Sequence, residues 1–274
     1  MKIYIMTDLE GVAGVQNSGD WCLPEGRYYE TGKELLTREV NAAIDGFIAA
    51  GAAEIAVADG HGWGAINPIL LDKRAELIAQ WFEPAYPFLL DKSYDAVAWV
   101  GQHARSRTEY AHLSHTGSFA VYEYTINGIA VGEFIEIALC AAELGVPSIF
   151  GAGDAAFGKQ AKEFSSAIET VAVKRGTRPG TGDECDADAY RMRNLSAIHF
   201  HPEKARELIR AGAEKALRRF IHGEKFEFEM SKPPFEMVKY FRADKDNPKR
   251  VGRATHPSSI IALLNEKVVF KPLT

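Results

Sequence analysis

The chain has 274 residues, of which 46% are hydrophobic and 25% are charged, and its formal net charge is −5 with an isoelectric point near 5.9. This length and composition are typical of a globular protein with a sizeable core, and they exclude a disordered or collagen-like chain. The acidic balance disfavours a general binder of nucleic acids or of anionic membranes.

The three cysteines, Cys22, Cys140 and Cys185, are odd in number and widely spaced. They match neither a disulfide framework nor a paired-cysteine metal site, which predicts a reducing compartment. The sequence runs from Met1 directly into a strand-like segment, with no leader pattern. Its apolar runs are all shorter than the roughly 20 residues that span a bilayer. We therefore expect a cytoplasmic protein with no membrane partner and no nucleic-acid partner.

The first 155 residues alternate strand and helix patterns. Apolar strand patterns occupy residues 3–7, 54–61, 94–103 and 148–154, and apolar residues recur at helical spacing over residues 33–50. The first two strands with the helix between them form a βαβ unit, which predicts parallel pairing. We expect further helices near residues 68–82 and from Glu133 to Leu144. Residues 118–134 contain two strand-like runs around Asn127-Gly128, a dipeptide that favours a tight hairpin.

The second half of the chain is less regular. We expect a helix over residues 157–165, a strand over 168–174, a polar loop over 176–193, a helix beginning at His201-Pro202, and strands near 225–230 and 235–241. The predicted fold class is therefore α/β, with a mostly parallel central sheet flanked by helices, a β-hairpin insertion and a smaller C-terminal α+β portion. We place a domain boundary near residue 155, between a catalytic domain (1–155) and the remainder (156–274). One continuous domain is the alternative.

Polar side chains stand at the ends of four predicted strands. Asp8 and Glu10 follow the first strand, His61 the second and His103 the third, and Glu133 follows the return strand of the hairpin. Because the carboxyl ends of parallel strands meet at one edge of a sheet, the loops that follow them converge on one crevice. Carboxylate oxygens and imidazole nitrogens together suit two divalent ions, zinc best, with manganese or cobalt as alternatives.

Each of these residues alone also has a structural explanation. An aspartate directly after a strand, such as Asp8, is often the N-cap of the next helix, and a glutamate at a helix start, such as Glu133, is favoured by the helix dipole. A single histidine often only makes structural hydrogen bonds. Five such residues at four strand ends on one edge are hard to explain in this way together. The sequence therefore favours a metal site.

Other polar residues near these strands have separate interpretations. His115 lies between the third strand and the hairpin, so we predict that it reaches the same crevice and acts as a general acid or base or steadies an oxyanion. His112 is the rival for this role, and we interpret it as a bystander. Asp59 is a candidate to hold a substrate amino group.

The motifs YIMTDLEGVAGV, ADGHGWG, GQHAR, LSHTGSF and INGIAVGEF occur in this order within the first 155 residues. In order and spacing they resemble the blocks of the bacterial D-aminopeptidase family, the binuclear zinc peptidases whose type member comes from a dipeptide-transport operon. The resemblance continues more faintly into the second half. The polar segment at residues 176–193 and the short C-terminal end depart from the family pattern, which leaves the substrate pocket and the oligomer contacts undetermined.

The resemblance implies a set of metal ligands that coincides with the strand-end residues: Asp8, Glu10, His61, His103 and Glu133. It implies that His115 is the catalytic histidine. It also implies that each subunit binds two Zn²⁺ and that the subunits form a homo-oligomer, a decameric ring. It further implies short peptide substrates with an N-terminal D-amino acid, of the D-Ala type, which are cleaved by a water that the two zinc ions activate.

We therefore expect a metallo-aminopeptidase. One alternative is a binuclear metallohydrolase that acts on another amide or on a phosphoester, and a phosphoester would require an anion clamp, for which Arg105 and Arg107 are the nearby candidates. The other alternative is a non-catalytic module in which the five ligands close the metal coordination and leave no open position.

Overall fold

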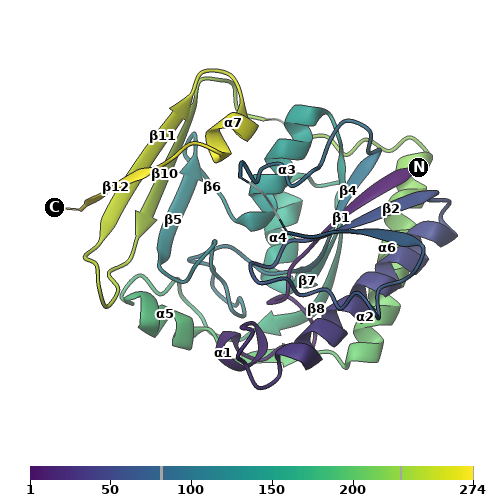
Figure 1. Ribbon diagram of the computed structural model, residues 1–274, viewed down its shortest axis with the longest axis horizontal. Helices are drawn as coiled ribbons and strands as arrows, with labels where there is room; N and C mark the ends of the chain where they lie inside the picture. Colours follow the sequence, from purple (N-terminus) through teal and green to yellow (C-terminus); the bar gives the residue numbers. More distant parts are fainter. Residues whose placement is uncertain (81–82, 229, 274) are drawn as a thin grey trace.

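The computed structural model describes residues 1–80, 83–228 and 230–273, and a mostly parallel seven-stranded sheet forms the centre of these residues (Figure 1). In spatial order its strands are β3 (Ala75–Ile78), β2 (Glu54–Asp59), β1 (Lys2–Thr7), β4 (Ala96–Gln102), β7 (Ser148–Asp154), β8 (Glu169–Gly176) and β9 (Ala197–His199). β8 and β9 pair in antiparallel, whereas the other neighbours pair in parallel. The predicted fold class is confirmed.

Helices cover both faces of this sheet. The helices are α1 (Ser18–Trp21), α2 (Tyr29–Ala49), α3 (Glu133–Leu144), α4 (Ala155–Phe164), α5 (Ala187–Arg193), α6 (Pro202–Ile221) and α7 (Ile260–Leu264). Successive residues of a strand point to opposite faces, so Ile3 and Ile5 of β1 join the core beneath α2 and α6, while Tyr4 and Met6 join the core beneath α3 and α4. β1 is thus buried on both sides, as a central parallel strand should be.

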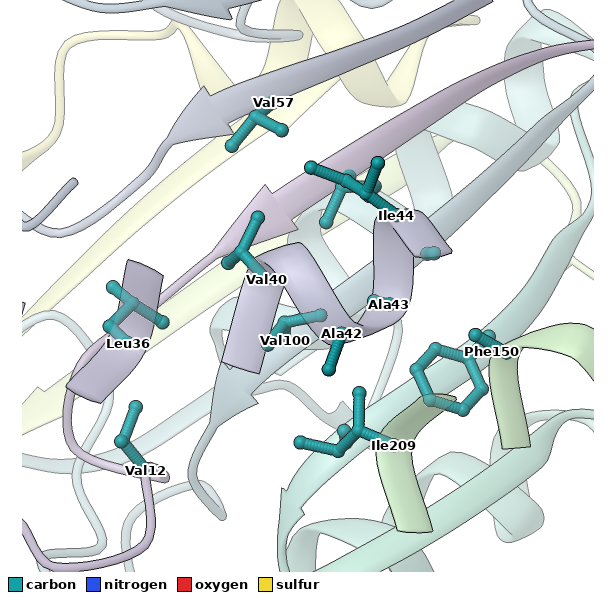
Figure 2. Close-up of a cluster of buried hydrophobic side chains, with 14 of the residues drawn as sticks. Val12, Leu36, Val40, Ala42, Ala43, Ile44, Val57, Val100, Phe150 and Ile209 are labelled. Carbon is teal, nitrogen blue, oxygen red and sulfur yellow. The ribbon is translucent and has the colours of Figure 1, made fainter. Parts of the chain in front are cut away.

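The core on the α2 and α6 face consists of aliphatic side chains at helical and strand spacing. Val40 and Ile44 of α2 and Ile209 of α6 lie over Val57 of β2 and Val100 of β4 (Figure 2). All five are essentially inaccessible to solvent. Burial of each such side chain contributes roughly 1.5–3 kcal/mol. This packing anchors the strands whose carboxyl ends carry the predicted site.

A second, antiparallel sheet of five strands lies beside the first (Figure 1). Its order is β12 (Val269–Pro272), β11 (Arg250–His256), β10 (Phe235–Phe241), β5 (Val121–Ile126) and β6 (Ile129–Ala130). β5 and β6 form the predicted hairpin, and Asn127 and Gly128 between them have φ angles of 48° and 78°. Positive φ at both turn residues is what the Asn-Gly dipeptide permits.

Two predicted elements are wrong. Residues 68–80 form turns and β3 instead of a helix, and residues 81–82 lie outside the described residues. The side chains of Asn67 and Asp72 accept hydrogen bonds from the backbone of Ile69 and Arg74, which stabilises turns at the expense of a helix. The strand expected over 225–230 is also missing from the part of that segment the structure describes, and the polar 176–193 segment ends in α5.

The elements that follow residue 155 continue both sheets. β8 and β9 extend the central sheet, and β10 to β12 pair onto the β5–β6 hairpin. α6 packs on the same core as α2. Both sheets thus include strands from both sides of residue 155. Among the described residues, none of the helices combines the length and hydrophobicity needed to cross a membrane.

The loop after β1 crosses the end of β4 at very short range. Gly101 has a φ angle of 81°, and a Cβ atom there would lie 1.9 Å from the carbonyl oxygen of Asp8. The backbone N–H of Gly11 donates to the Gly101 carbonyl at 2.7 Å. A side chain at residue 101 would therefore push Asp8 away from the sheet edge.

We expect Gly101→Ala to lower the free energy of unfolding by roughly 2–4 kcal/mol, because a left-handed backbone and a backbone collision both oppose the added methyl group. Gly128→Ala is the matched control: Gly128 has a φ of 78° but nothing within 4 Å of the added Cβ, so a loss of only about 1 kcal/mol is expected there. Urea unfolding of both variants measures the difference. Equal losses would contradict the proposed collision.

Candidate metal centre

All six site residues predicted from the sequence lie together at the carboxyl edge of the central sheet. β1 lies between β2 and β4, so the loops after these three strands leave the sheet side by side. The residues are Asp8 and Glu10 after β1, His61 after β2, His103 after β4, His115 in the loop between β4 and β5, and Glu133 as the first residue of α3. The strand order changes direction between β1 and β4, which is where open α/β sheets bind ligands.

Asp8 lies between two of the histidines. Its Oδ1 atom is 3.5 Å from His61 Nδ1, and its Oδ2 atom is 3.1 Å from His103 Nε2. The Leu9 N–H donates to Oδ1 at 2.8 Å and the Gln102 amide donates to Oδ2 at 3.1 Å, which fixes the plane of the carboxylate. A carboxylate that presents one oxygen to each of two imidazoles has the orientation needed to bridge two cations.

A further carboxylate stands on each side of Asp8. Glu10 Oε2 is 3.3 Å from His61 Nδ1, and Glu133 Oε2 is 3.4 Å from His103 Nε2. The donor atoms therefore divide into two sets, Glu10 with His61 and Glu133 with His103. Asp8 belongs to both sets.

A backbone carbonyl fixes one ring nitrogen of each site histidine. His61 Nε2 is 2.8 Å from the Cys22 oxygen, His103 Nδ1 is 2.9 Å from the Ala104 oxygen, and His115 Nδ1 is 2.8 Å from the Leu113 oxygen. Because a carbonyl can only accept, the contacting nitrogen carries a proton, and the other nitrogen faces the carboxylates. Metal-binding histidines are oriented in this way.

The close pairing shifts the pKa values of the site groups. Burial lowers the pKa of His61, but the negative charges of Glu10 and Asp8 outweigh it and raise the pKa to about 12. Burial likewise opposes ionisation of His103, and the charges of Glu133 and Asp8 raise its pKa well above the usual value. Burial raises the pKa of Glu133, whereas His103 and His115 lower it, with a net value of about 2. The three carboxylates thus favour positive charge at this edge of the sheet.

The residues present fit a divalent transition metal. Glu10 Oε2 and His103 Nε2 are buried and contact charged neighbours, but neither makes a hydrogen bond within the described residues. Donor atoms of Asp8, Glu10 and His103, and those of His103, His115 and Glu133, lie within 4.8 Å of one another. Mixed carboxylate and imidazole donors are suited to zinc.

A cavity of about 450 Å³ opens over these residues. Its floor includes Asp8, Glu10 and Glu133, and its walls include Leu23 and Phe119. Concave sites of this size with apolar walls and a few converging polar groups are typical of small-ligand sites. The site residues are therefore accessible to a small substrate.

His115 faces the same cavity. Its ring stacks on His103 with 4.2 Å between centroids and on Phe119 with 4.5 Å between centroids. Its Nε2 atom is 3.6 Å from Glu133 Oε1. The two aromatic neighbours hold the ring plane, so that Nε2 points to the acidic floor.

His112, the rival histidine, lies outside this cavity. Its Nε2 atom donates to the carbonyl of Gln16 at 3.0 Å, and burial lowers its pKa to about 2. A neutral, buried histidine that holds a loop has no role at the floor of the cavity. Its ring nitrogen contacts this loop, and it is absent from the described residues that line the cavity.

Three other side chains hold the same loop and were missed in the sequence. Glu39 Oε1 accepts from Ala13 N at 3.0 Å, His199 Nδ1 accepts from Gly14 N at 3.1 Å, and Lys174 Nζ donates to the Val15 oxygen at 3.3 Å. The sequence contains one indication that Glu39 is buried, because the helical spacing places it on the buried face of α2, three residues after Leu36. Nothing in the sequence links Lys174 or His199 to this loop.

Three residues considered in the sequence do not contribute to the floor of the cavity. Both oxygens of Asp59 accept backbone N–H groups, from Ala65 and Ile66, and Asp59 is absent from the described residues that line the cavity, so its position gives no support to a contact with a substrate amino group. Arg107 pairs with Asp183 and Glu123.

Arg105 and Arg107 are both absent from the described residues that line the cavity. The anion clamp that a phosphoester substrate requires is thus not supplied by these two arginines.

Comparison with known proteins agrees with this geometry. A D-aminopeptidase of Bacillus subtilis (strain 168) is 32% identical over 180 residues, which is 64% of this chain and 64% of that protein, so the match spans less than two thirds of the relative. The solved structure of the Zn-dependent D-aminopeptidase DppA from Bacillus subtilis, described as a self-compartmentalizing protease, has a TM-score of 0.79 and 22% identity and covers 97% of this chain and 95% of that one. This likeness confirms the fold.

The family model for D-aminopeptidase matches residues 1–244. The matched region contains every element of the central sheet and all six residues of the candidate site. The resemblance carried by the sequence motifs is thereby confirmed, and the chain belongs to the D-aminopeptidase family.

Proposed function

We propose that this protein is a metal-dependent aminopeptidase that hydrolyses short peptides with an N-terminal D-amino acid, of the D-Ala type, and that it uses two zinc ions per subunit. The observation that carries the proposal is Asp8, which presents one oxygen to His61 and the other to His103. The metal ligands in this proposal are Asp8, Glu10, His61, His103 and Glu133. Family membership supports the reaction.

Bound zinc supplies Lewis-acid polarisation of the scissile carbonyl and lowers the pKa of water. The chain supplies the proton transfers. His115 donates through Nδ1 to the Leu113 carbonyl, so its Nε2 atom is free to take a proton and to return it to the leaving amine. The apolar cavity walls exclude bulk water and strengthen the interactions on the floor.

The openness of the site favours catalysis over a structural metal module. The Glu133 side chain is 27% exposed and faces the cavity, whereas a structural site would be closed by its protein ligands. The positions of Arg105 and Arg107 give no support to a phosphoester substrate.

We also propose that the protein forms a homo-oligomer, the decameric ring that the resemblance implies. We further propose that it is located in the cytoplasm. DppA, the structural neighbour, is described as self-compartmentalizing. Large apolar side chains are exposed on the described surface, and Ile69, Leu89 and Val269 are between 69% and 90% exposed. The three cysteines are free, which agrees with a reducing compartment.

A metal analysis and a hydrolysis panel test the proposed function. Protein purified without chelator is expected to contain about two zinc ions per chain, in line with two donor sets that share one carboxylate. It is expected to cleave D-Ala-D-Ala and longer D-peptides in preference to L-Ala-L-Ala, to lose activity with a chelator and to regain it with zinc. A folded, active protein without metal, or cleavage of p-nitrophenyl phosphate alone, would overturn the proposal.

A further inference from the structure

An arginine side chain lines the same cavity as the acidic site residues. Among the described residues that line this cavity, Arg191 is the only lysine or arginine. It belongs to α5, a short helix that begins after Asp186, whose side chain accepts from Ala189 N. α5 lies within the polar segment at residues 176–193, to which the sequence analysis assigned no role.

Among the residues that the structure describes, the guanidinium of Arg191 has one weak ion-pair partner. Its ion pair is with Asp188 Oδ1 at 4.0 Å, one turn earlier on α5, and the Asp188 side chain is 78% exposed. A contact of this length between exposed groups contributes little. By contrast, Arg193 on the same helix donates to Asn194 and to the Pro179 carbonyl at 2.8 and 2.5 Å.

The cavity thus offers charges of both signs to a ligand. Asp8, Glu10 and Glu133 line it together with Arg191, and Leu23 and Phe119 are among its apolar lining residues. A short peptide with two free ends carries the complementary charges, a positive amino group and a negative carboxylate. Arginine binds carboxylates through two parallel N–H donors, and this pairing is among the stronger hydrogen bonds in proteins.

We propose that Arg191 binds the C-terminal carboxylate of the peptide, so that the enzyme selects short peptides with a free C-terminus. This assignment rests on the proposed function. It adds that the free C-terminal carboxylate is the feature by which the enzyme selects the length of the peptide. A peptide amide lacks the negative charge, and a long peptide carries its carboxylate beyond the cavity. Arg191 is thus a specificity residue and not part of the metal centre.

The test compares D-Ala-D-Ala with its C-terminal amide as substrates of the zinc-loaded enzyme. Arg191→Gln is expected to lower kcat/KM for the free acid by roughly 10- to 100-fold, mainly through KM, since hydrogen bonds to charged groups contribute about 1.5–3 kcal/mol. The same variant is expected to cleave the amide within about threefold of the wild-type rate, because the lost group has no partner there. Arg191→Lys is expected to recover part of the loss.

Asp188→Asn is the matched control, because Asp188 lies on the same helix and is exposed. It is expected to leave both substrates and the zinc content unchanged. Equal losses on acid and amide in Arg191→Gln, or no loss on either, would overturn the assignment of Arg191 while the peptidase activity stands. Failure of the zinc-loaded wild type to cleave any peptide would overturn this assignment and the proposed function together.

Discussion

Replacing Asp8 with alanine is expected to abolish peptide hydrolysis and to remove bound zinc. Asp8 is the carboxylate that faces both His61 and His103, so its loss takes a donor from both sets at once. Metal ions contribute several kcal/mol of transition-state stabilisation, which corresponds to a fall in kcat/KM of roughly a thousandfold or more. Elemental analysis and peptide kinetics on the same sample measure the two effects.

Asp154→Asn is a suitable control for this variant. Asp154 also ends a strand of the central sheet, but its oxygens accept from the backbone of Ala156 and His112 and it caps α4. Asparagine is also a good N-cap, so zinc content and activity are expected to persist. Full zinc occupancy in the Asp8→Ala protein would contradict the bridging role.

Replacing His115 with alanine is expected to lower kcat by about 10²–10⁴-fold, the range for loss of a general acid or base, and to leave the zinc content unchanged. The stacked contacts with His103 and Phe119 hold the ring, and the proposed zinc ligands are other residues. Steady-state kinetics and elemental analysis distinguish a catalytic role from a ligand role.

Added imidazole is expected to restore part of the activity of His115→Ala, because the removed ring leaves space that opens to the cavity. His115 also lies among candidate donor atoms with His103 and Glu133. Loss of one zinc ion in the variant would therefore make His115 a ligand, and unchanged kcat would remove it from the mechanism.

The site residues could be found in the sequence because they follow strands whose patterns are unambiguous. Ile3, Ile5, Val57 and Val100 alternate or cluster in a way that only buried strands explain, and the parallel order then fixes a common edge. The hairpin was equally clear from Asn127-Gly128. Local sequence was sufficient wherever the structural feature depended on neighbours along the chain.

The errors arose where side chains act over long sequence distances or compete with the backbone. The helix expected near residues 68–82 failed because Asn67 and Asp72 bind the backbone, which hydrophobic spacing does not report. β11 and β12 were missed because the residues of β12 are exposed, most of those of β11 are only half-buried, and both strands depend on pairing, β11 with β10 and β12 with β11. The position of Arg191 over the site depends on how α5 packs against distant segments.

The four side chains that hold residues 13–16 also bear on the order of folding. Glu39 and His112 precede residue 155, but Lys174 and His199 follow it, and they contact the loop that begins directly after Asp8 and Glu10. A fragment that ends at residue 155 would carry every proposed zinc ligand and still lack two of the four restraints on this loop. Because synthesis runs from the N-terminus, all the proposed zinc ligands are made before two of the four side chains that hold the neighbouring loop, Lys174 of β8 and His199 of β9.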